Sequence, residues 1–139
     1  MKLSRRDALW AGLGGIATAT LANPLFAKTV EELSADFTGG AVPGTGGITI
    51  TAPEIAENGN TVPVSVNAPG AVAIMLLAAG NPTPAVATFA FGPAAGSQMA
   101  ATRIRLATTQ DVIALAKMAD GSIVQAVATV KVTIGGCGG

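Results

Sequence analysis

Short runs of alternating apolar and polar residues, separated by turn-forming residues, occupy most of the sequence beyond residue 47. These runs lie at residues 48–51, 62–66, 71–79, 85–91, 99–106, 111–118 and 123–134. Alternation places successive side chains on opposite faces of an extended chain, so the runs predict β-strands. About seven short strands in about 100 residues, with turns every 8–12 residues, are typical of a β-sandwich. We therefore predict an all-β sandwich domain.

Two of these runs have a second interpretation. Residues 71–79 are apolar at nearly every position, whereas one face of a sandwich strand should meet water. A partner subunit that covers the strand explains this pattern, because large exposed apolar patches mark interfaces. A helix, or a strand with exposed alanines, explains it as well. Residues 111–118 also fit a helix, since Val112, Leu115 and Ala116 have helical spacing.

A short helix is predicted ahead of the strands, at residues 29–36. Thr29 can cap its first turn, and the carboxylates of Glu31 and Glu32 suit the positive N-terminal end of a helix. Gly39 and the glycine after it end the helical pattern.

The N-terminal segment has the pattern of a removable export signal. Lys2, Arg5 and Arg6 form a short basic region, and an apolar run at residues 8–25 follows and ends in small residues. A membrane-spanning helix needs about 20 predominantly apolar residues. Glycine, threonine, asparagine and proline interrupt this run, so cleavage is favoured over spanning.

The adjacent Arg5 and Arg6 indicate export by the bacterial twin-arginine route. An ordinary secretory signal also uses a basic pair, but Asp7 directly after it and the modest apolar core favour the twin-arginine route. Cleavage is expected after Ala27, although a site after Ala22 also fits. The mature protein is therefore expected in the periplasm and not in the membrane.

Several functional classes are disfavoured by what the sequence lacks. It contains no histidine, which is the commonest general base and metal ligand, and it has one cysteine. One cysteine allows neither an internal disulfide nor a thiolate metal cluster. Eight basic and eight acidic residues, with few aromatics, leave no basic patch for nucleic acid. We expect a non-catalytic protein without metal or cofactor.

The chemistry of the sequence is concentrated at its C-terminus. Residues 135–139 read Gly-Gly-Cys-Gly-Gly, so that Cys137 is flanked by Gly135, Gly136, Gly138 and Gly139. Glycine has the widest backbone freedom, so we expect a mobile arm. Three extended residues span roughly 10 Å, enough to carry a thiol into a pocket of another protein. The predicted organisation is a signal at 1–27, a sandwich domain at 28–134 and a swinging arm at 135–139.

Simpler roles for Cys137 fit less well. A buried structural cysteine is disfavoured three residues from the end and between two glycine pairs. A prenylation box requires the cysteine four residues from the end. An exposed thiol is a liability in an oxidising compartment, so its presence indicates a use.

The terminal Gly-Gly-Cys-Gly-Gly resembles that of the SoxY family, the sulfur-compound carriers of the bacterial Sox thiosulfate-oxidising system. Further segments carry the resemblance, at residues 55–64, 81–84, 89–93, 102–107, 118–121 and 130–134. The likeness therefore covers nearly the whole mature chain. Residues 67–80 depart from it, because they are rich in alanine and poor in charge, and this leaves the details of partner contacts open.

The resemblance implies that Cys137 is the covalent attachment point for the substrate, in an immunoglobulin-like sandwich. It implies that SoxXA, a c-type cytochrome, joins thiosulfate oxidatively to the thiol, and that SoxB then releases sulfate. SoxCD, where present, oxidises the remaining sulfur. It also implies a heterodimer with a SoxZ subunit, which the twin-arginine route can carry across as a folded complex. The presence of SoxCD and the length of the carried sulfur chain stay open.

Two other functions remain open. A ubiquitin-like sulfur carrier also ends in two glycines, but such carriers work in the cytoplasm, and the export signal and the strand-rich pattern argue against one. An exported structural module, dimerised through a disulfide at Cys137, is the second alternative. Reducing and non-reducing gels distinguish it from a carrier, because a structural disulfide is quantitative and permanent.

Overall fold

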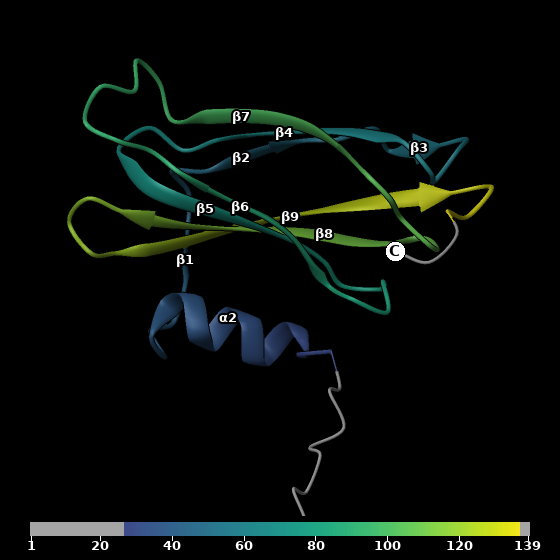
Figure 1. Cartoon of the computed structure of the whole chain (residues 1–139), viewed down its shortest axis with the longest axis horizontal. Coiled ribbons are helices and arrows are strands. Elements are labelled where there is room, and N and C mark those ends of the chain that lie inside the picture. Colours follow the sequence, from purple (N-terminus) through teal and green to yellow (C-terminus); the bar gives the residue numbers. More distant parts are fainter. Residues whose placement is uncertain (1–26, 137–139) are drawn as a thin grey trace, which may run out of the picture.

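The computed structural model describes residues 27–136, which form two facing β-sheets and one short helix (Figure 1). The helix is α2 (Val30–Thr38). The strands are β1 (Gly44–Thr45), β2 (Thr49–Thr51), β3 (Ile55–Ala56), β4 (Val62–Asn67), β5 (Ala71–Ala78), β6 (Ala85–Ala90), β7 (Met99–Ile104), β8 (Gln110–Met118) and β9 (Ile123–Val132).

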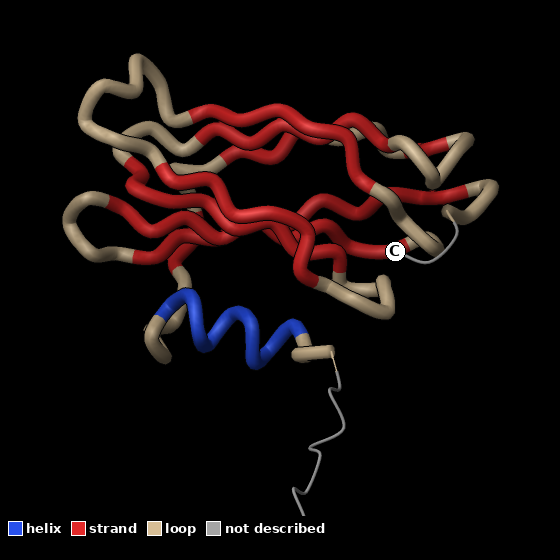
Figure 2. The backbone as a smooth tube through the Cα atoms, viewed as in Figure 1, coloured by secondary structure: helices blue, strands red, loops and turns tan. Residues whose placement is uncertain are grey.

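The larger sheet has the strand order β1-β9-β8-β5-β6, and β3 also pairs with β9. The smaller sheet has the order β2-β4-β7. β1 and β3 run parallel to β9, and the other pairings are antiparallel. Figure 2 shows the strands of the two sheets as separate layers joined by loops at both ends. The predicted all-β sandwich with a short helix is confirmed, whereas the immunoglobulin-like assignment stays a prediction.

The main core lies between the two sheets. The larger side chains buried completely in it come from both sheets and from the loop after β7: Val62, Val66, Ile74, Leu76, Leu106, Val112 and Val130. Complete burial of one such side chain contributes about 1.5–3 kcal/mol relative to exposure. This packing fixes the start of β4 and the ends of β7 and β9 relative to one another. The candidate functional site described below lies beside these three points.

Strand β5 is apolar on both faces because the protein itself covers both. Ile74 and Leu76 face the main core, whereas Met75 and Leu77 belong to a second cluster on the other side of the sheet. Val30, Leu33 and Phe37 of α2 pack against that second cluster, and Figure 1 shows the helix lying on the outer side of the larger sheet. The interpretation of residues 71–79 as a strand covered by a partner is therefore wrong for Met75 and Leu77.

Residues around 111–118, which fitted either a strand or a helix, form β8. This strand pairs with β5 on one side and with β9 on the other, with Leu115 opposite both Met75 and Gln125. Both of its neighbours supply backbone partners over almost its full length, and a helix would leave those partners unpaired. Within residues 27–136, no helix is long and apolar enough to cross a membrane.

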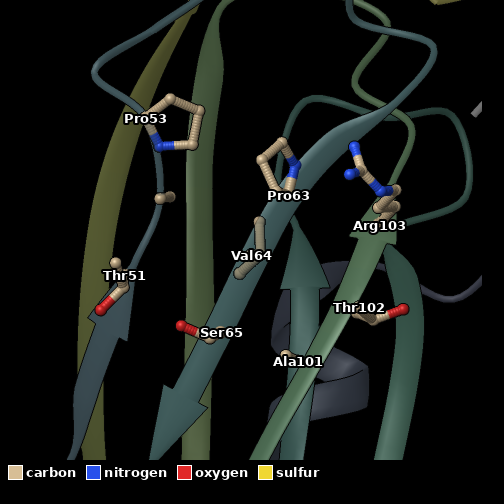
Figure 3. Close-up of a pocket in the computed structure, with 9 residues that line it drawn as sticks. Thr51, Pro53, Pro63, Val64, Ser65, Ala101, Thr102 and Arg103 are labelled. Carbon is tan, nitrogen blue, oxygen red and sulfur yellow. The ribbon is translucent and has the colours of Figure 1, made fainter.

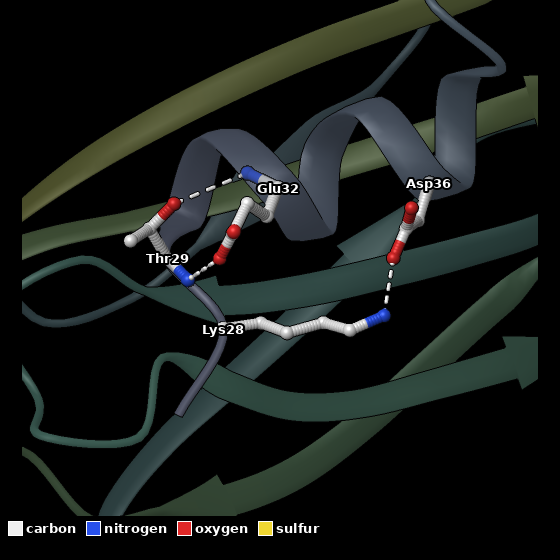
Figure 4. A network of polar contacts seen from close by, with 4 residues as sticks. All are labelled: Lys28, Thr29, Glu32 and Asp36. Carbon is white, nitrogen blue, oxygen red and sulfur yellow. Dashed lines mark hydrogen bonds and ion pairs between the residues drawn. The ribbon is translucent and has the colours of Figure 1, made fainter. Parts of the chain in front are cut away.

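Helix α2 begins as its sequence predicts. The Thr29 hydroxyl accepts a hydrogen bond from the Glu32 amide at 3.2 Å, and the Glu32 carboxylate accepts one from the Thr29 amide at 2.8 Å (Figure 4). Gly39 ends the helix in the left-handed conformation, with φ of 66°. Lys28 donates to the Asp36 carboxylate at 2.5 Å, and this contact raises the pKa of Lys28 above its usual value.

Candidate functional site

The segment after β9 is hydrogen-bonded to the segment that precedes β4. The amide of Thr133 donates to the carbonyl oxygen of Ala56 at 3.1 Å, and its hydroxyl donates to that of Glu57 at 2.9 Å. The carbonyl oxygen of Ile134 then accepts a hydrogen bond from the amide of Gly59 at 2.7 Å. The C-terminal segment therefore continues the pairing begun by β3 and β9, two residues beyond the end of the strand.

Three backbone hydrogen bonds form a closed ring at this end of the sandwich. Gly136 donates to Leu106 at 2.9 Å, Leu106 donates to Gly59 at 2.8 Å, and Gly59 donates to Ile134. Gly59, Leu106 and Gly136 are all buried. We call these three residues, together with Ile134, the terminal ring. It joins the loop before β4, the loop after β7 and the end of the described chain.

The glycines of this region allow the three segments to approach closely. A Cβ atom on Gly135 would lie 2.1 Å from the carbonyl oxygen of Ala107, and one on Gly136 would lie 2.8 Å from that of Gly59. A Cβ atom on Gly59 would lie 2.3 Å from the carbonyl oxygen of Leu106. Each distance is too short for two nonbonded atoms, so only glycine fits without a backbone shift.

The structure differs here from the expectation of an arm that is free from Gly135 onward. Gly136 is buried and hydrogen-bonded, and Gly135, although exposed, lies against the backbone of Ala107. From the sequence, we attributed these glycines to a need for backbone mobility. In the structure they allow close packing, because a side chain at either position would clash with a backbone carbonyl oxygen. The other predicted site residues lie outside the described residues: Cys137, Gly138, Gly139, Arg5 and Arg6.

Two buried side-chain amides form hydrogen bonds to the loop after β7, which contains Leu106 of the terminal ring. Asn81 donates to the carbonyl oxygen of Arg105 at 2.8 Å and accepts from the amide of Ala107 at 2.9 Å. The amide nitrogen of Gln110 donates to Asn81 at 2.8 Å and to the carbonyl oxygen of Thr108 at 3.0 Å. Asn81 therefore pairs with the backbone on both sides of Leu106, as a neighbouring strand would.

Sequence reasoning did not find this network. Asn81 stands between Gly80 and Pro82, a combination that indicates a turn and an exposed side chain. Gln110 is the first residue of β8, next to Asp111, and gives no signal of burial in the sequence. The useful signal was the resemblance at residues 55–64, 81–84 and 102–107, three segments that the fold brings together beside Gly136.

A shallow groove of about 690 Å³ lies on the outer face of the smaller sheet (Figure 3). Pro53 and Pro63 stand at one end of it, and Arg103 supplies its charged group. It is lined by Thr51, Ala52, Pro53, Pro63, Val64, Ser65, Ala101, Thr102 and Arg103. None of these residues belongs to the terminal ring, so the groove is a separate feature.

Within residues 27–136, no group of three or more His, Cys, Asp or Glu side chains is placed to hold a metal ion. At the turn between β8 and β9, the amide and hydroxyl of Ser122 donate to the Asp120 carboxylate at 2.9 and 2.6 Å. These bonds stabilise the charged form and lower the pKa of Asp120 from its usual value. This turn shares no residue with the terminal ring.

A family model described as "Sulfur oxidation protein SoxY" matches residues 34–137. The match spans most of the chain and reaches Cys137. The chain belongs to the SoxY family. Among solved structures, the sulfur carrier protein SoxY from Chlorobium limicola f thiosulfatophilum is 35% identical, with a TM-score of 0.65. That alignment covers 76% of this chain and 97% of the Chlorobium SoxY.

More distant structures share only the fold of this SoxY family member. The superoxide reductase (Neelaredoxin) from Ignicoccus hospitalis is 18% identical, with a TM-score of 0.55, and the alignment covers 77% of this chain and 95% of that one. A putative superoxide reductase from Thermotoga maritima is also 18% identical, with a TM-score of 0.53 and coverage of 77% and 94%. No curated protein matches the sequence.

Proposed function

We propose that this protein is a periplasmic, non-catalytic sulfur carrier in thiosulfate oxidation, and that Cys137 is its covalent attachment point. The observation that carries the proposal is the SoxY family match, which extends to residue 137. Cys137 is the only thiol in the chain, so no other residue can form a disulfide bond to a sulfur substrate. The 35% identity to a SoxY named as a sulfur carrier supports the same role.

Loading is a two-electron oxidation. The sulfur atom of Cys137 loses its proton and forms an S–S bond with the outer sulfur of thiosulfate, giving Cys-S-S-sulfonate. One proton and two electrons are released, and a partner oxidoreductase of the SoxXA class accepts the electrons. Hydrolysis by a SoxB-class partner then adds water across the terminal S–S bond, which releases sulfate and leaves a persulfide on Cys137. Where SoxCD is present, it oxidises this remaining sulfur.

The carrier needs partners because it offers no activating group of its own in the described residues beside the arm. The backbones of Gly59 and Leu106 lie against Gly136, the last described residue, and neither carries a side chain that can act as a base. Thiolate formation therefore falls to the enzyme that receives the thiol. We propose that the protein works as a heterodimer with a SoxZ-like subunit.

Replacement of the thiol tests the function. Cys137→Ser, introduced into a strain that lacks the wild-type gene, is expected to give a folded protein that supports no thiosulfate oxidation. Gly92→Ala is a matched control, because a Cβ atom at Gly92 meets nothing within 4 Å. It is expected to restore full oxidation. Thiosulfate oxidation by cells that contain only the Cys137→Ser protein would eliminate the carrier proposal.

Replacement of the arginine pair tests export. Arg5→Lys combined with Arg6→Lys is expected to leave the precursor in the cytoplasm if the twin-arginine route is used. Cell fractionation followed by immunoblotting measures the distribution. Unchanged export of the double variant would replace the twin-arginine proposal by an ordinary secretory signal, and it would leave the role of Cys137 unaffected.

A further inference from the structure

We propose that the terminal ring clamps the base of the arm, and that Gly59, Leu106 and Asn81 are positioning residues for Cys137. The inference deepens the proposed function and rests on it. Gly136 is the last described residue, and Cys137 follows it directly in the sequence. The point at which the thiol-bearing residue leaves the sandwich is therefore set by what holds Gly136.

The clamp consists of backbone groups that have defined partners. Gly136 donates to Leu106, Leu106 to Gly59, and Gly59 to Ile134, at 2.9, 2.8 and 2.7 Å. A typical hydrogen bond makes a modest net contribution to stability, and more is lost when a buried donor stays unpaired. Since Gly136 and Leu106 are buried, release of Gly136 leaves the carbonyl oxygen of Leu106 without this hydrogen bond and exposes the amide of Gly136. The clamped arrangement is thus favoured over a free one.

The support behind the clamp is also specific. Leu106 lies in the loop after β7, and the side chain of this residue is fully buried in the main core. The Asn81 side chain is hydrogen-bonded to the backbone on either side of Leu106. The Gln110 side chain donates to Asn81, and its amide oxygen accepts a hydrogen bond from Gly80 at 2.8 Å. Two buried amides with all these bonds satisfied hold a loop rigidly. This loop presents the carbonyl oxygen that accepts from Gly136.

The clamp shortens the reach of the arm. If the arm were free from Gly135, three extended residues would allow roughly 10 Å of reach at the thiol-bearing residue. With Gly136 held, one residue allows roughly 3.5 Å, plus the length of the cysteine side chain. An enzyme that receives the thiol must then contact the exposed loops beside the clamp, at Asn58 and Thr108.

The single thiol gives a direct measurement of the clamp. A nitroxide spin label attached to Cys137 reports its mobility by electron paramagnetic resonance, and hydrogen exchange followed by NMR reports the amides of Gly59, Leu106 and Gly136. In the wild-type chain these amides are expected to be protected by roughly 2- to 13-fold over a free peptide, the range that one net hydrogen bond gives. The label is expected to show restricted motion.

Gly136→Ala is the test variant, because its Cβ atom would lie 2.8 Å from the carbonyl oxygen that accepts from Leu106. It is expected to speed exchange of the amide at position 136 by roughly 2- to 13-fold and to increase label mobility, while amides in β5 and β8 keep their protection. The matched control Gly92→Ala is expected to change neither reading.

Each outcome decides the proposal. Wild-type amides that exchange at free-peptide rates overturn the clamp, whether or not any variant folds. A Gly136→Ala protein with unchanged label mobility also overturns it. Neither amide exchange nor label mobility depends on sulfur transfer, so these measurements test the clamp independently of the carrier function. If Cys137 carries no sulfur adduct in cells but the amides are protected, the clamp stands and the proposed function fails.

Discussion

The amide nitrogen of Gly59 donates a 2.7 Å hydrogen bond to the carbonyl oxygen of Ile134, and this bond joins the loop before β4 to the segment after β9. Gly59 also accepts from Leu106 at 2.8 Å, so a single glycine connects three parts of the chain that are remote in sequence. The C-terminal end of the sandwich is thereby held by its own backbone. The stability of the domain and the position of Gly136 are linked through this one residue.

Gly59→Ala is expected to destabilise the domain. Its Cβ atom would lie 2.3 Å from the carbonyl oxygen of Leu106 and 2.9 Å from the Val132 side chain. Overpacking of this kind costs roughly 1–3 kcal/mol. Urea unfolding measures the change, with Gly92→Ala as the control for a glycine-to-alanine change in open space. Equal stabilities of the two variants would contradict the close packing at Gly59.

Asn81→Ala is expected to lower the free energy of unfolding by roughly 1–3 kcal/mol, because it leaves buried groups unpaired. These groups are the carbonyl oxygen of Arg105, the amide of Ala107 and the Gln110 side chain. Asn67→Ala serves as the control, since Asn67 is exposed on β4. Surface changes of this sort stay within about 0.5 kcal/mol. A similar loss for both variants would show that the buried network contributes nothing specific.

Leu33→Gln is expected to loosen α2 from the larger sheet. Leu33 packs against the cluster that contains Met75 and Leu77, so its replacement uncovers apolar surface on β5. We expect lower stability and concentration-dependent self-association in sedimentation or light scattering. Ala35→Gln, on the exposed side of the same helix, is the matched control. A monodisperse Leu33→Gln protein of wild-type stability would contradict the role of the helix as a cover.

The turn at Asp120 is expected to give a small dependence of stability on pH. Hydrogen bonds from Ser122 lower the folded-state pKa of Asp120 below the ordinary 3.8. The stabilisation from this carboxylate is therefore present above that ordinary pKa and is lost as the pH falls through the folded-state value. Ser122→Ala removes the hydroxyl donor. The stability difference between wild type and Ser122→Ala should be larger at pH 7 than at pH 2, and an equal difference would refute the assignment.

Local signals in the sequence predicted much of the fold. Thr29, as a capping residue, predicted the start of α2, and the alternation at Val130 and Val132 predicted the last part of β9, although the predicted strand ran two residues further. Each of these signals depends on neighbours in the sequence. The cover over Met75 and Leu77 depends on where α2 packs, which no local pattern determines, and a partner explained the same apolar run.

The site was predicted in part for the same reason. Cys137 and its flanking glycines are evident in the sequence, because a thiol among four glycines is an unusual combination. The roles of Gly136, Leu106 and Asn81 follow from contacts between remote segments. Glycine is compatible with both free motion and close packing, and only the distance to a neighbouring carbonyl distinguishes them.

The mass of the peptide that contains Cys137 tests the central claim most directly. Protein isolated under acidic, non-reducing conditions from cells oxidising thiosulfate should carry sulfur adducts on this peptide, including the mass of a sulfonated persulfide. Dithiothreitol should remove them, and cells grown without thiosulfate should lack them. A cysteine peptide that is unmodified during active oxidation, or linked only to a second copy of itself, would contradict the carrier role.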